Sequence, residues 1–186
     1  GVGLDDDDLR EQIGEVGAAD EDADVDVFAG VEANVDAEGD ISVADDVLAD
    51  LDCVVASPHS GLGTEATDRL VTAVEHPSVD VLGHPSGRLI NQRQGLEFDV
   101  REVARAAAEH DVALEVNANP NRLDLWGGAV HVAVDEGATI AIDTDAHSPG
   151  EYANVRYGVH TARRGWAEAG DVLNARDADG VREFLH

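Results

Sequence analysis

Short apolar runs that end in polar side chains alternate with helix-like segments through most of this chain. The run over residues 139–143 is rich in β-branched and small apolar residues and leads into Asp145 and His147. Such a pattern is typical of a buried strand that presents polar groups at its carboxyl end. Four earlier runs have the same form, at residues 25–34, 53–59, 79–85 and 113–117. The alternation predicts an α/β fold with a parallel sheet, either open or closed into a barrel.

The residues at the ends of these runs favour the barrel. Only a closed ring brings the carboxyl ends of five strands around one cavity. Because side chains two apart on a strand project to the same side, we expect Asp145 and His147 to converge on one point. The end residues, in chain order, are Glu32, His59, His84, Asn117 and the Asp145/His147 pair.

Most of these end residues are of the types that bind metal ions. The candidate ligands exceed what one four-coordinate zinc ion requires, so we expect two or more ions that share a bridging carboxylate. Such ions acidify bound water and neutralise phosphate oxygens, as phosphoester hydrolysis requires. Taken singly, a histidine or glutamate at a strand end is more often a loop-capping or hydrogen-bonded residue than a ligand, and it is the shared position of these residues that favours metal binding. The candidate ligands are Glu32, His59, His84, Asp145 and His147, whereas His76, His110, His131, His160 and His186 are expected to be non-ligands.

Three arginines and one asparagine follow strand ends and are candidates for substrate contact. Forked guanidinium groups suit phosphate recognition, which makes Arg88 and Arg122, and less so Arg93, candidate phosphate ligands. Salt bridges to the many acidic residues are the alternative for all three. Asn117 either orients substrate or satisfies backbone groups.

The charge of the chain restricts its partners. It has 40 acidic residues against 12 basic ones, a net charge of −28, and all 12 basic residues are arginine. An acidic, lysine-free surface indicates a protein from a salt-accumulating halophile, because molar salt screens charges within a few ångströms. The same charge opposes broad binding to DNA at low salt and leaves only a local arginine cluster for that purpose.

Further features predict a single cytoplasmic domain over residues 1–186. Cys53 has no partner for a disulfide, which favours a buried thiol in a reducing compartment. No apolar run approaches the length of a membrane span, and the acidic residues 5–8 do not fit a signal peptide. Helical spacing and caps predict helices over residues 6–18, 64–75, 99–110, 126–136, 161–169 and 177–185.

Several of these segments match a known family when they are taken together. The segments are Gly-Val-Glu32, Ala-Ser-Pro-His59-Ser, Leu-Gly-His84-Pro-Ser-Gly-Arg88-Leu-Ile, Leu-Glu-Val-Asn117-Ala-Asn-Pro-Asn-Arg122-Leu-Asp-Leu and Asp-Thr-Asp145-Ala-His147-Ser. They resemble the PHP (polymerase and histidinol phosphatase) domain, and more narrowly the PHP domain at the C-terminal end of bacterial and archaeal family X DNA polymerases. The segment from Tyr157 to Trp166 resembles that subgroup too.

The resemblance implies a distorted (β/α)7 barrel of the TIM-barrel type with a site for two to three divalent ions, zinc or manganese. It implies that Glu32 is the bridging ligand, that His59, His84, Asp145 and His147 complete the part of the site in this chain, and that Glu32, His59 and Asp145 act in catalysis through the ions. The family's other ligands are expected upstream of Gly1. We therefore expect this chain to lack the first one or two βα units, to bind ions partially and to be inactive by itself.

Three functions follow from the resemblance. The first is a metal-dependent 3′–5′ exonuclease or 3′-phosphatase acting on DNA ends, joined to an upstream polymerase domain in a repair polymerase. The second is a stand-alone phosphatase for a small phosphomonoester such as histidinol phosphate. The third is a non-catalytic domain that braces a polymerase. The sequence preceding Gly1 and the ester that is hydrolysed would distinguish them.

Overall fold

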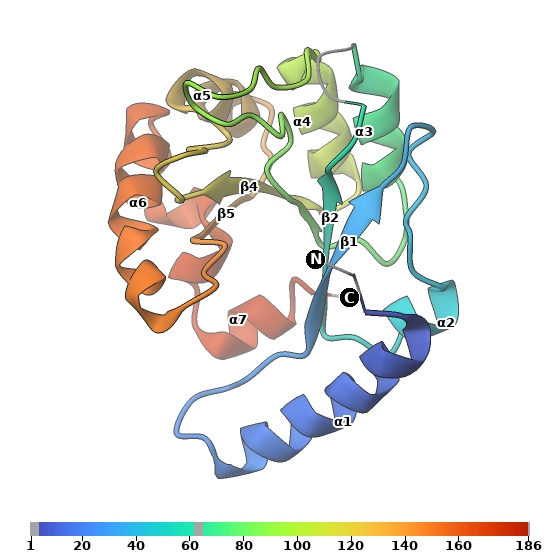
Figure 1. Cartoon of the computed structure of the whole chain (residues 1–186). Coiled ribbons are helices and arrows are strands. Elements are labelled where there is room, and N and C mark those ends of the chain that lie inside the picture. The colour runs from blue at the N-terminus through green and yellow to red at the C-terminus, as the bar shows by residue number, and fades with distance from the viewer. Residues whose placement is uncertain (1–3, 62–64, 186) are drawn as a thin grey trace.

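A computed structural model describes residues 4–61 and 65–185 of the chain, and its centre is one parallel sheet. The five strands lie side by side in chain order (Figure 1). Their bounds are β1 Gly30–Val35, β2 Cys53–Pro58, β3 Val81–Leu82, β4 Ala113–Asn117 and β5 Ile140–Asp143. Sequential parallel order with helical connections is the arrangement of a TIM-like α/β fold. The closed barrel and the missing βα units stay predictions.

The helices connect the strands and cover the outer face of the sheet. Helices α3, α4, α5 and α6 follow one another around that face, each packed against the next (Figure 1). No helix among the described residues is both long and apolar enough to cross a membrane. The helices are α1 Asp6–Asp22, α2 Asp45–Leu48, α3 Thr67–Val74, α4 Val100–Glu109, α5 Gly127–Asp135, α6 Val155–Arg164 and α7 Ala178–Arg182, with 3-10 helices η1 Pro149–Asn154, η2 Ala169–Asp171 and η3 Leu173–Ala175.

Several sequence-based boundaries were wrong. The strand expected from residue 25 begins at Gly30, the helix expected to end at residue 18 continues to Asp22, and the last helix ends at Arg182 and not at residue 185. The helix expected over residues 161–169 is α6, which begins six residues earlier, at Val155, and ends at Arg164 because Trp166 takes a left-handed backbone with φ 65°. The strand expected over residues 79–85 is shortened to two residues because the backbone of His84 turns out of the extended region with φ 24°. Residue 64, the expected start of the third helix, lies outside the described residues.

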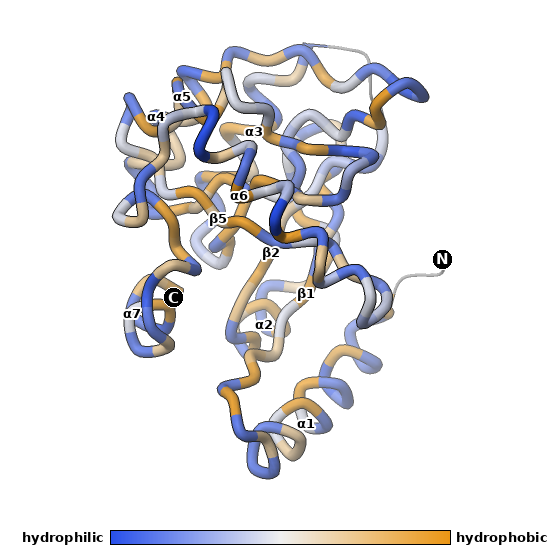
Figure 2. The backbone as a smooth tube through the Cα atoms, turned by 90° about the vertical axis from the view of Figure 1, so that its left-hand side faces the viewer, coloured by the Kyte–Doolittle hydropathy of each residue, from blue (hydrophilic) through white to orange (hydrophobic). Residues whose placement is uncertain are grey.

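Alternating strand residues build a core on the outer side of the sheet. Side chains at every second position, such as Val54, Leu82 and Ile140, are fully buried against helix residues such as Leu70 and Val130. Figure 2 shows the hydrophobic residues concentrated through β2 and β5. This is the expected alternation for strands whose two faces meet different neighbours.

The inner face of the sheet is apolar near the amino ends of the strands and acidic toward their carboxyl ends. Near the amino ends, Val81, Ala113 and Ala141 form a small apolar cluster that Leu173 and Phe184 of the C-terminal segment cover. Toward the carboxyl ends the same face carries acidic side chains, which line two cavities described below. The C-terminal segment therefore closes one end of this inner face, and the polar site occupies the other.

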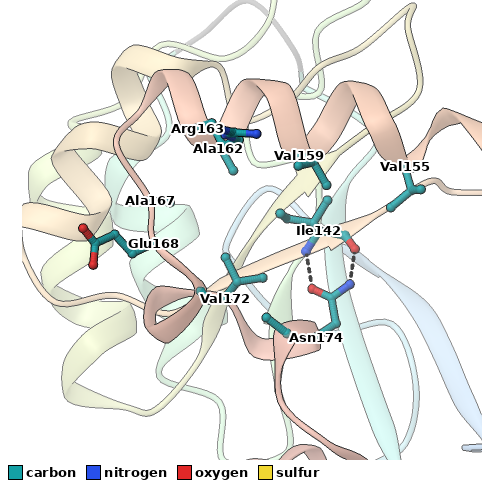
Figure 3. A pocket seen from close by; sticks show the side chains of 11 residues that line it. Ile142, Val155, Val159, Ala162, Arg163, Ala167, Glu168, Val172 and Asn174 are labelled. Atoms are coloured by element: carbon teal, nitrogen blue, oxygen red, sulfur yellow. Dashed lines mark hydrogen bonds between the residues drawn. The ribbon is translucent and has the colours of Figure 1, made fainter.

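An amide side chain completes the outer edge of β5. Val172 forms a single parallel bridge with Ile140. Beyond it the Asn174 side chain accepts a hydrogen bond from the N–H of Ile142 at 3.0 Å and donates one to the carbonyl of the same residue (Figure 3). Asn174 thus satisfies backbone groups that a neighbouring strand would otherwise pair.

Cys53 gives a direct probe of this packing. Burial, aided by the charges of Asp80 and Asp143, raises the pKa of the Cys53 thiol to about 12. Because the thiolate is the nucleophile, the native protein should react with a disulfide reagent near neutral pH roughly a hundredfold or more slowly than the unfolded chain. Absorbance of the released thiolate, with and without denaturant, measures both rates. Equal rates would show that Cys53 is accessible and that this face of β2 is not packed as described.

Candidate metal centre

Three side chains from successive strands converge at the carboxyl edge of the sheet. Glu32, His59 and His84 each place one ligand-type atom within 4.8 Å of the other two. The Glu32 Oε1 atom lies 2.9 Å from Nε2 of His84 and 3.5 Å from Nε2 of His59. One carboxylate oxygen is thus flanked by two imidazole nitrogens, which is a mixed donor set that suits several divalent ions.

The local chain path explains this convergence. Glu32 lies within β1, opposite Val55 of β2, and not at the end of its strand as we had expected. His59 follows directly after β2, and His84 lies two residues beyond β3 in a tight bend. The side chains of His59 and His84 meet edge to face, with ring centroids 5.2 Å apart.

The two histidines of the cluster favour the ionised form of the Glu32 carboxyl. The nearby imidazoles of His59 and then of His84 lower the pKa of the Glu32 carboxyl well below its ordinary value, against the opposing effect of its partial burial. Glu32 is therefore an anion at any physiological pH. An anionic oxygen between two imidazoles is the protonation state that a divalent cation needs from its ligands.

The three side chains of the cluster are better arranged to bind a metal ion than to form hydrogen bonds with one another. The His84 side chain is 2% exposed, yet neither of its ring nitrogens has a hydrogen-bond partner of good geometry among the described residues. Buried polar atoms are rarely left in this state unless they have a functional partner. The Glu32, His59 and His84 side chains together provide three protein donors, the number that catalytic zinc sites take from protein while leaving one position open.

Asp145 and His147 line two neighbouring cavities that Glu32 also borders, but they do not join the cluster. The strand geometry expected for this pair is wrong, because β5 ends at Asp143 and Asp145 adopts a left-handed backbone with φ 48°. His147 is 82% exposed and its Nδ1 lies 2.8 Å from the carbonyl of Asp145. His147 lines a cavity of about 760 Å³ with Glu32 and His59, and Asp145 lines a neighbouring cavity of about 360 Å³ with Glu32.

The candidate substrate residues have different surroundings. Arg88 donates from Nε to the carbonyl of Arg122 at 2.8 Å and from Nη2 to the carbonyl of Leu123, so much of its donor capacity is used to hold that loop. Arg122 lies with Nε 3.7 Å from Asp145, and its buried Nη1 has no partner among the described residues. Asn117 donates to both Glu115 and Asp145, at 3.3 and 3.4 Å.

Sequence reasoning overlooked the buried carboxyl group of Glu115, which lies close to the partly buried Asp143. Glu115 is 4% exposed, and it accepts hydrogen bonds from the backbone N–H of His84 and from Asn117. Burial, together with the nearby charge of Asp143, raises the pKa of Glu115 well above its ordinary value. Glu115 fixes the backbone that carries the His84 ring. The signal was present, since Glu115 shares a strand face with Asn117.

Two other buried polar residues hold the loops around the site. Arg69 of α3 donates to the carbonyls of Ser60 and Val35, which ties the chain beyond His59 to the end of β1. Asp124 is fully buried and accepts hydrogen bonds from the backbone N–H and hydroxyl of Ser86, two residues after His84. No local motif marks either residue, because their partners are 9 to 38 positions away in sequence.

Comparison with known proteins identifies relatives of this chain. No protein-family model matches it. It is 41% identical over 162 residues to the DNA polymerase/3′-5′ exonuclease PolX of Bacillus subtilis, an alignment that covers 86% of this chain and 28% of the relative. It is 34% identical over 136 residues to a probable phosphatase of Caldicellulosiruptor bescii, covering 65% of the chain and 52% of the relative. A probable phosphatase of Thermoanaerobacter pseudethanolicus is 25% identical over 174 residues.

Fold, site and relatives together define what the chain is. A parallel α/β sheet with a His/carboxylate cluster at its carboxyl edge is an arrangement that fits a divalent metal ion. The matches confirm the resemblance that the motifs indicated, and the chain belongs with the PHP domains, alongside that of the family X polymerase PolX and the related phosphatases. It spans less than two thirds of the length of either of the first two relatives. The remainder of PolX lies outside the matched part.

Proposed function

We propose that the chain is a metal-dependent phosphoesterase domain that removes nucleotides or phosphate from DNA 3′ ends, as part of a repair polymerase of family X. The observation that carries this proposal is the convergence of Glu32, His59 and His84 within 4.8 Å at the sheet edge. The name of the Bacillus subtilis relative, which includes a 3′-5′ exonuclease, supports the choice of reaction. A polymerase domain upstream in the parent chain is part of the same proposal.

The ligand set that we propose extends the cluster. Glu32, His59 and His84 hold the first ion, and Asp145 and His147, which border the same two cavities, serve a second or third ion. Zinc or manganese ions would activate a water molecule and offset phosphate charge when bound. A mixed shell of imidazole and carboxylate suits both metals.

The residues around the cluster have separate tasks in this proposal. Arg122, whose buried Nη1 has no partner among the described residues, holds a phosphate oxygen at the cavity. Asn117 orients the substrate and Asp145 through its amide. Arg88 supports both by holding the backbone of residues 122 and 123 through two of its five N–H groups, and its Nη1 group remains for a phosphate.

A small phosphomonoester is the alternative substrate. Relatives named as probable phosphatases match 65% and 87% of this chain, so the same domain also occurs in proteins described as phosphatases. Histidinol phosphate is an example of such an ester. The two substrates differ in size, and the open rim of the cavities lined by Glu32 does not exclude either.

One assay separates the two substrates. The purified chain, loaded with zinc or manganese, is incubated with a 3′-labelled single-stranded oligonucleotide, an oligonucleotide with a 3′-phosphate, and a simple phosphomonoester. We expect metal-dependent release from the DNA ends at a kcat/KM at least about tenfold above that for the small ester, because remote contacts to substrate lower the barrier. The reverse preference would favour the phosphatase. If the chain bound the ion but cleaved none of these esters, the result would contradict the proposal and fit the sequence-based expectation of an inactive chain.

A further inference from the structure

The distribution of acidic residues sets one segment of the surface apart. Residues 152–167 contain none of the 40 acidic residues of the chain but three of its 12 arginines. This segment comprises the second half of η1, all of α6 and the turn that follows. Elsewhere the surface repels polyanions, so a polyanionic partner can approach only where the acidic residues are absent.

The basic groups of this segment are available to a partner. Arg156, His160 and Arg164 occupy positions four apart on α6, and all three are exposed, so they form one stripe along the helix. Among the described residues, the Arg156 guanidinium interacts with the Tyr157 side chain, through its hydroxyl and ring, and forms no ion pair. Arg164 has no ion pair or side-chain hydrogen bond among the described residues. Residues 81–96 are also free of acidic residues, but their two arginines are bound to backbone carbonyls.

Exposed aromatic rings accompany the stripe. Tyr152 is 68% exposed, and Tyr157 is 36% exposed at the first turn of α6. Most of the Tyr152 side chain and about a third of Tyr157 are open to solvent, and nucleobases stack on exposed rings whatever their sequence. Cations that alternate with exposed rings are the combination by which proteins bind single strands.

The stripe starts at the candidate metal centre. Tyr152 lines the same cavity as Glu32 and Asp145, and α6 follows directly from η1. In Figure 1, α6 runs along the outside of the sheet away from this region. A strand that lies on α6 therefore has one end at the site where the ester would be cleaved.

From these observations we infer that η1 and α6 form a track for single-stranded DNA. In this track Arg156, His160 and Arg164 face the phosphates, and Tyr152 and Tyr157 stack on the bases nearest the site. The inference rests on the proposed function, because it names the path by which a DNA 3′ end reaches the proposed centre. A rival occupant is an acidic protein segment. Its acidic residues would pair with the arginines, and its apolar residues would suit the apolar cavity of about 260 Å³ beside Val155 and Val159 (Figure 3).

The test measures affinity for a fluorescent oligodeoxythymidylate by anisotropy, without metal, over a series of KCl concentrations. The double variant Arg156→Gln/Arg164→Gln should bind at least about tenfold more weakly at low salt, and the slope of log affinity against log salt should become shallower by about 1.4, about 0.7 for each lost contact to a phosphate of a single strand. Tyr157→Leu should lower affinity about fivefold or more and leave the slope unchanged. Circular dichroism at each salt concentration verifies that every variant is folded.

The matched control is Arg101→Gln/Arg105→Gln on α4, which removes the same charge from arginines that are 53% and 57% exposed and bound to Glu136. Its affinity for the oligonucleotide should stay within twofold of that of the unmodified chain, and its slope of log affinity against log salt should be unchanged. Equal losses in both double variants, or no loss in the α6 variant, would overturn the inference. Polyglutamate that competed as well as DNA would assign the surface to an acidic protein.

The outcome is separable from that of the proposed function. Metal-dependent hydrolysis of a small phosphodiester by the unmodified chain tests the centre without using the track. If that hydrolysis were present and the α6 variant bound DNA normally, only the track would be refuted. If hydrolysis were absent and the α6 variant lost DNA binding, the track would stand and the phosphoesterase would be refuted.

Discussion

Replacing Glu32 with glutamine is expected to weaken binding of zinc or manganese by at least about a hundredfold. The amide keeps the shape of the carboxylate, but it removes the one anionic oxygen between His84 and His59. Metal ligands are more sensitive to such a change than their supporting partners, for which losses of about 10–100-fold are typical. Isothermal titration calorimetry with each ion measures the affinity, and any metal-dependent ester hydrolysis should fall at least in parallel.

Glu38→Gln is the matched control for this prediction. Glu38 is an exposed carboxylate in the turn that follows β1, so the variant has the same change in charge and nearly the same place in sequence. It should bind both ions as the unmodified chain does. Ion binding by Glu32→Gln at unmodified affinity would contradict the assignment of this residue, and equal weakening in both variants would reduce the effect to net charge.

Gly158→Ala is expected to destabilise the fold by about 1–3 kcal/mol, because it overfills the contact between α6 and the sheet. A Cβ atom at this position would lie 2.6 Å from Cγ2 of Ile142 and 2.9 Å from Cβ of Ala118. Both neighbours belong to the packed region where β4 and β5 meet α6, and neither is the free end of a long side chain. Urea unfolding followed by circular dichroism gives the change in the free energy of unfolding.

The control for Gly158→Ala is the same substitution in α1. A Cβ atom at Gly14 would have nothing within 4 Å, so the variant tests helix propensity alone. Gly14→Ala should raise stability by up to about 1 kcal/mol. A stabilised Gly158→Ala variant would show that α6 does not pack on the sheet as closely as described, and it would also weaken the placement of the DNA track.

The sequence was a good guide to the fold wherever periodicity decided the structure. The apolar runs that became β2, β4 and β5 and the helices from Val100 and Gly127 were predicted within about two residues, because each has one buried face and clear end signals. Positive φ at His84 and Trp166 was not predictable, since neither residue is a glycine or asparagine. Those two bends account for the short β3 and for the wrong position of α6.

The site was predicted less evenly than the fold. Residue type and position at strand ends identified Glu32, His59 and His84, which the structure brings together. The same reasoning placed Asp145 and His147 on a strand that has already ended, so their distance from the cluster was not foreseen. Glu115, Asp124 and Arg69 were missed because their roles depend on contacts across the sheet. Burial in three dimensions, unlike periodicity, leaves little trace in a single sequence.

The halophilic origin that the acidic surface indicates remains a prediction, and it affects the choice of salt concentration in every assay. If the chain comes from a halophile, its stability should rise from dilute buffer to molar KCl, where repulsion among its 40 carboxylates is screened. Metal binding at Glu32 involves partly buried atoms and should tolerate such salt. Binding along α6 depends on exposed arginines and should weaken as salt rises.

Anomalous X-ray diffraction from crystals grown with zinc or manganese, with data collected on both sides of the absorption edge of the ion, tests the metal centre most directly. The account predicts a difference-density peak bonded to Oε1 of Glu32 and to Nε2 of both His59 and His84, at about 2.0–2.2 Å for zinc. A chain saturated with the ion by mass spectrometry that showed no peak among these three atoms, or peaks only elsewhere on the molecule, would contradict it.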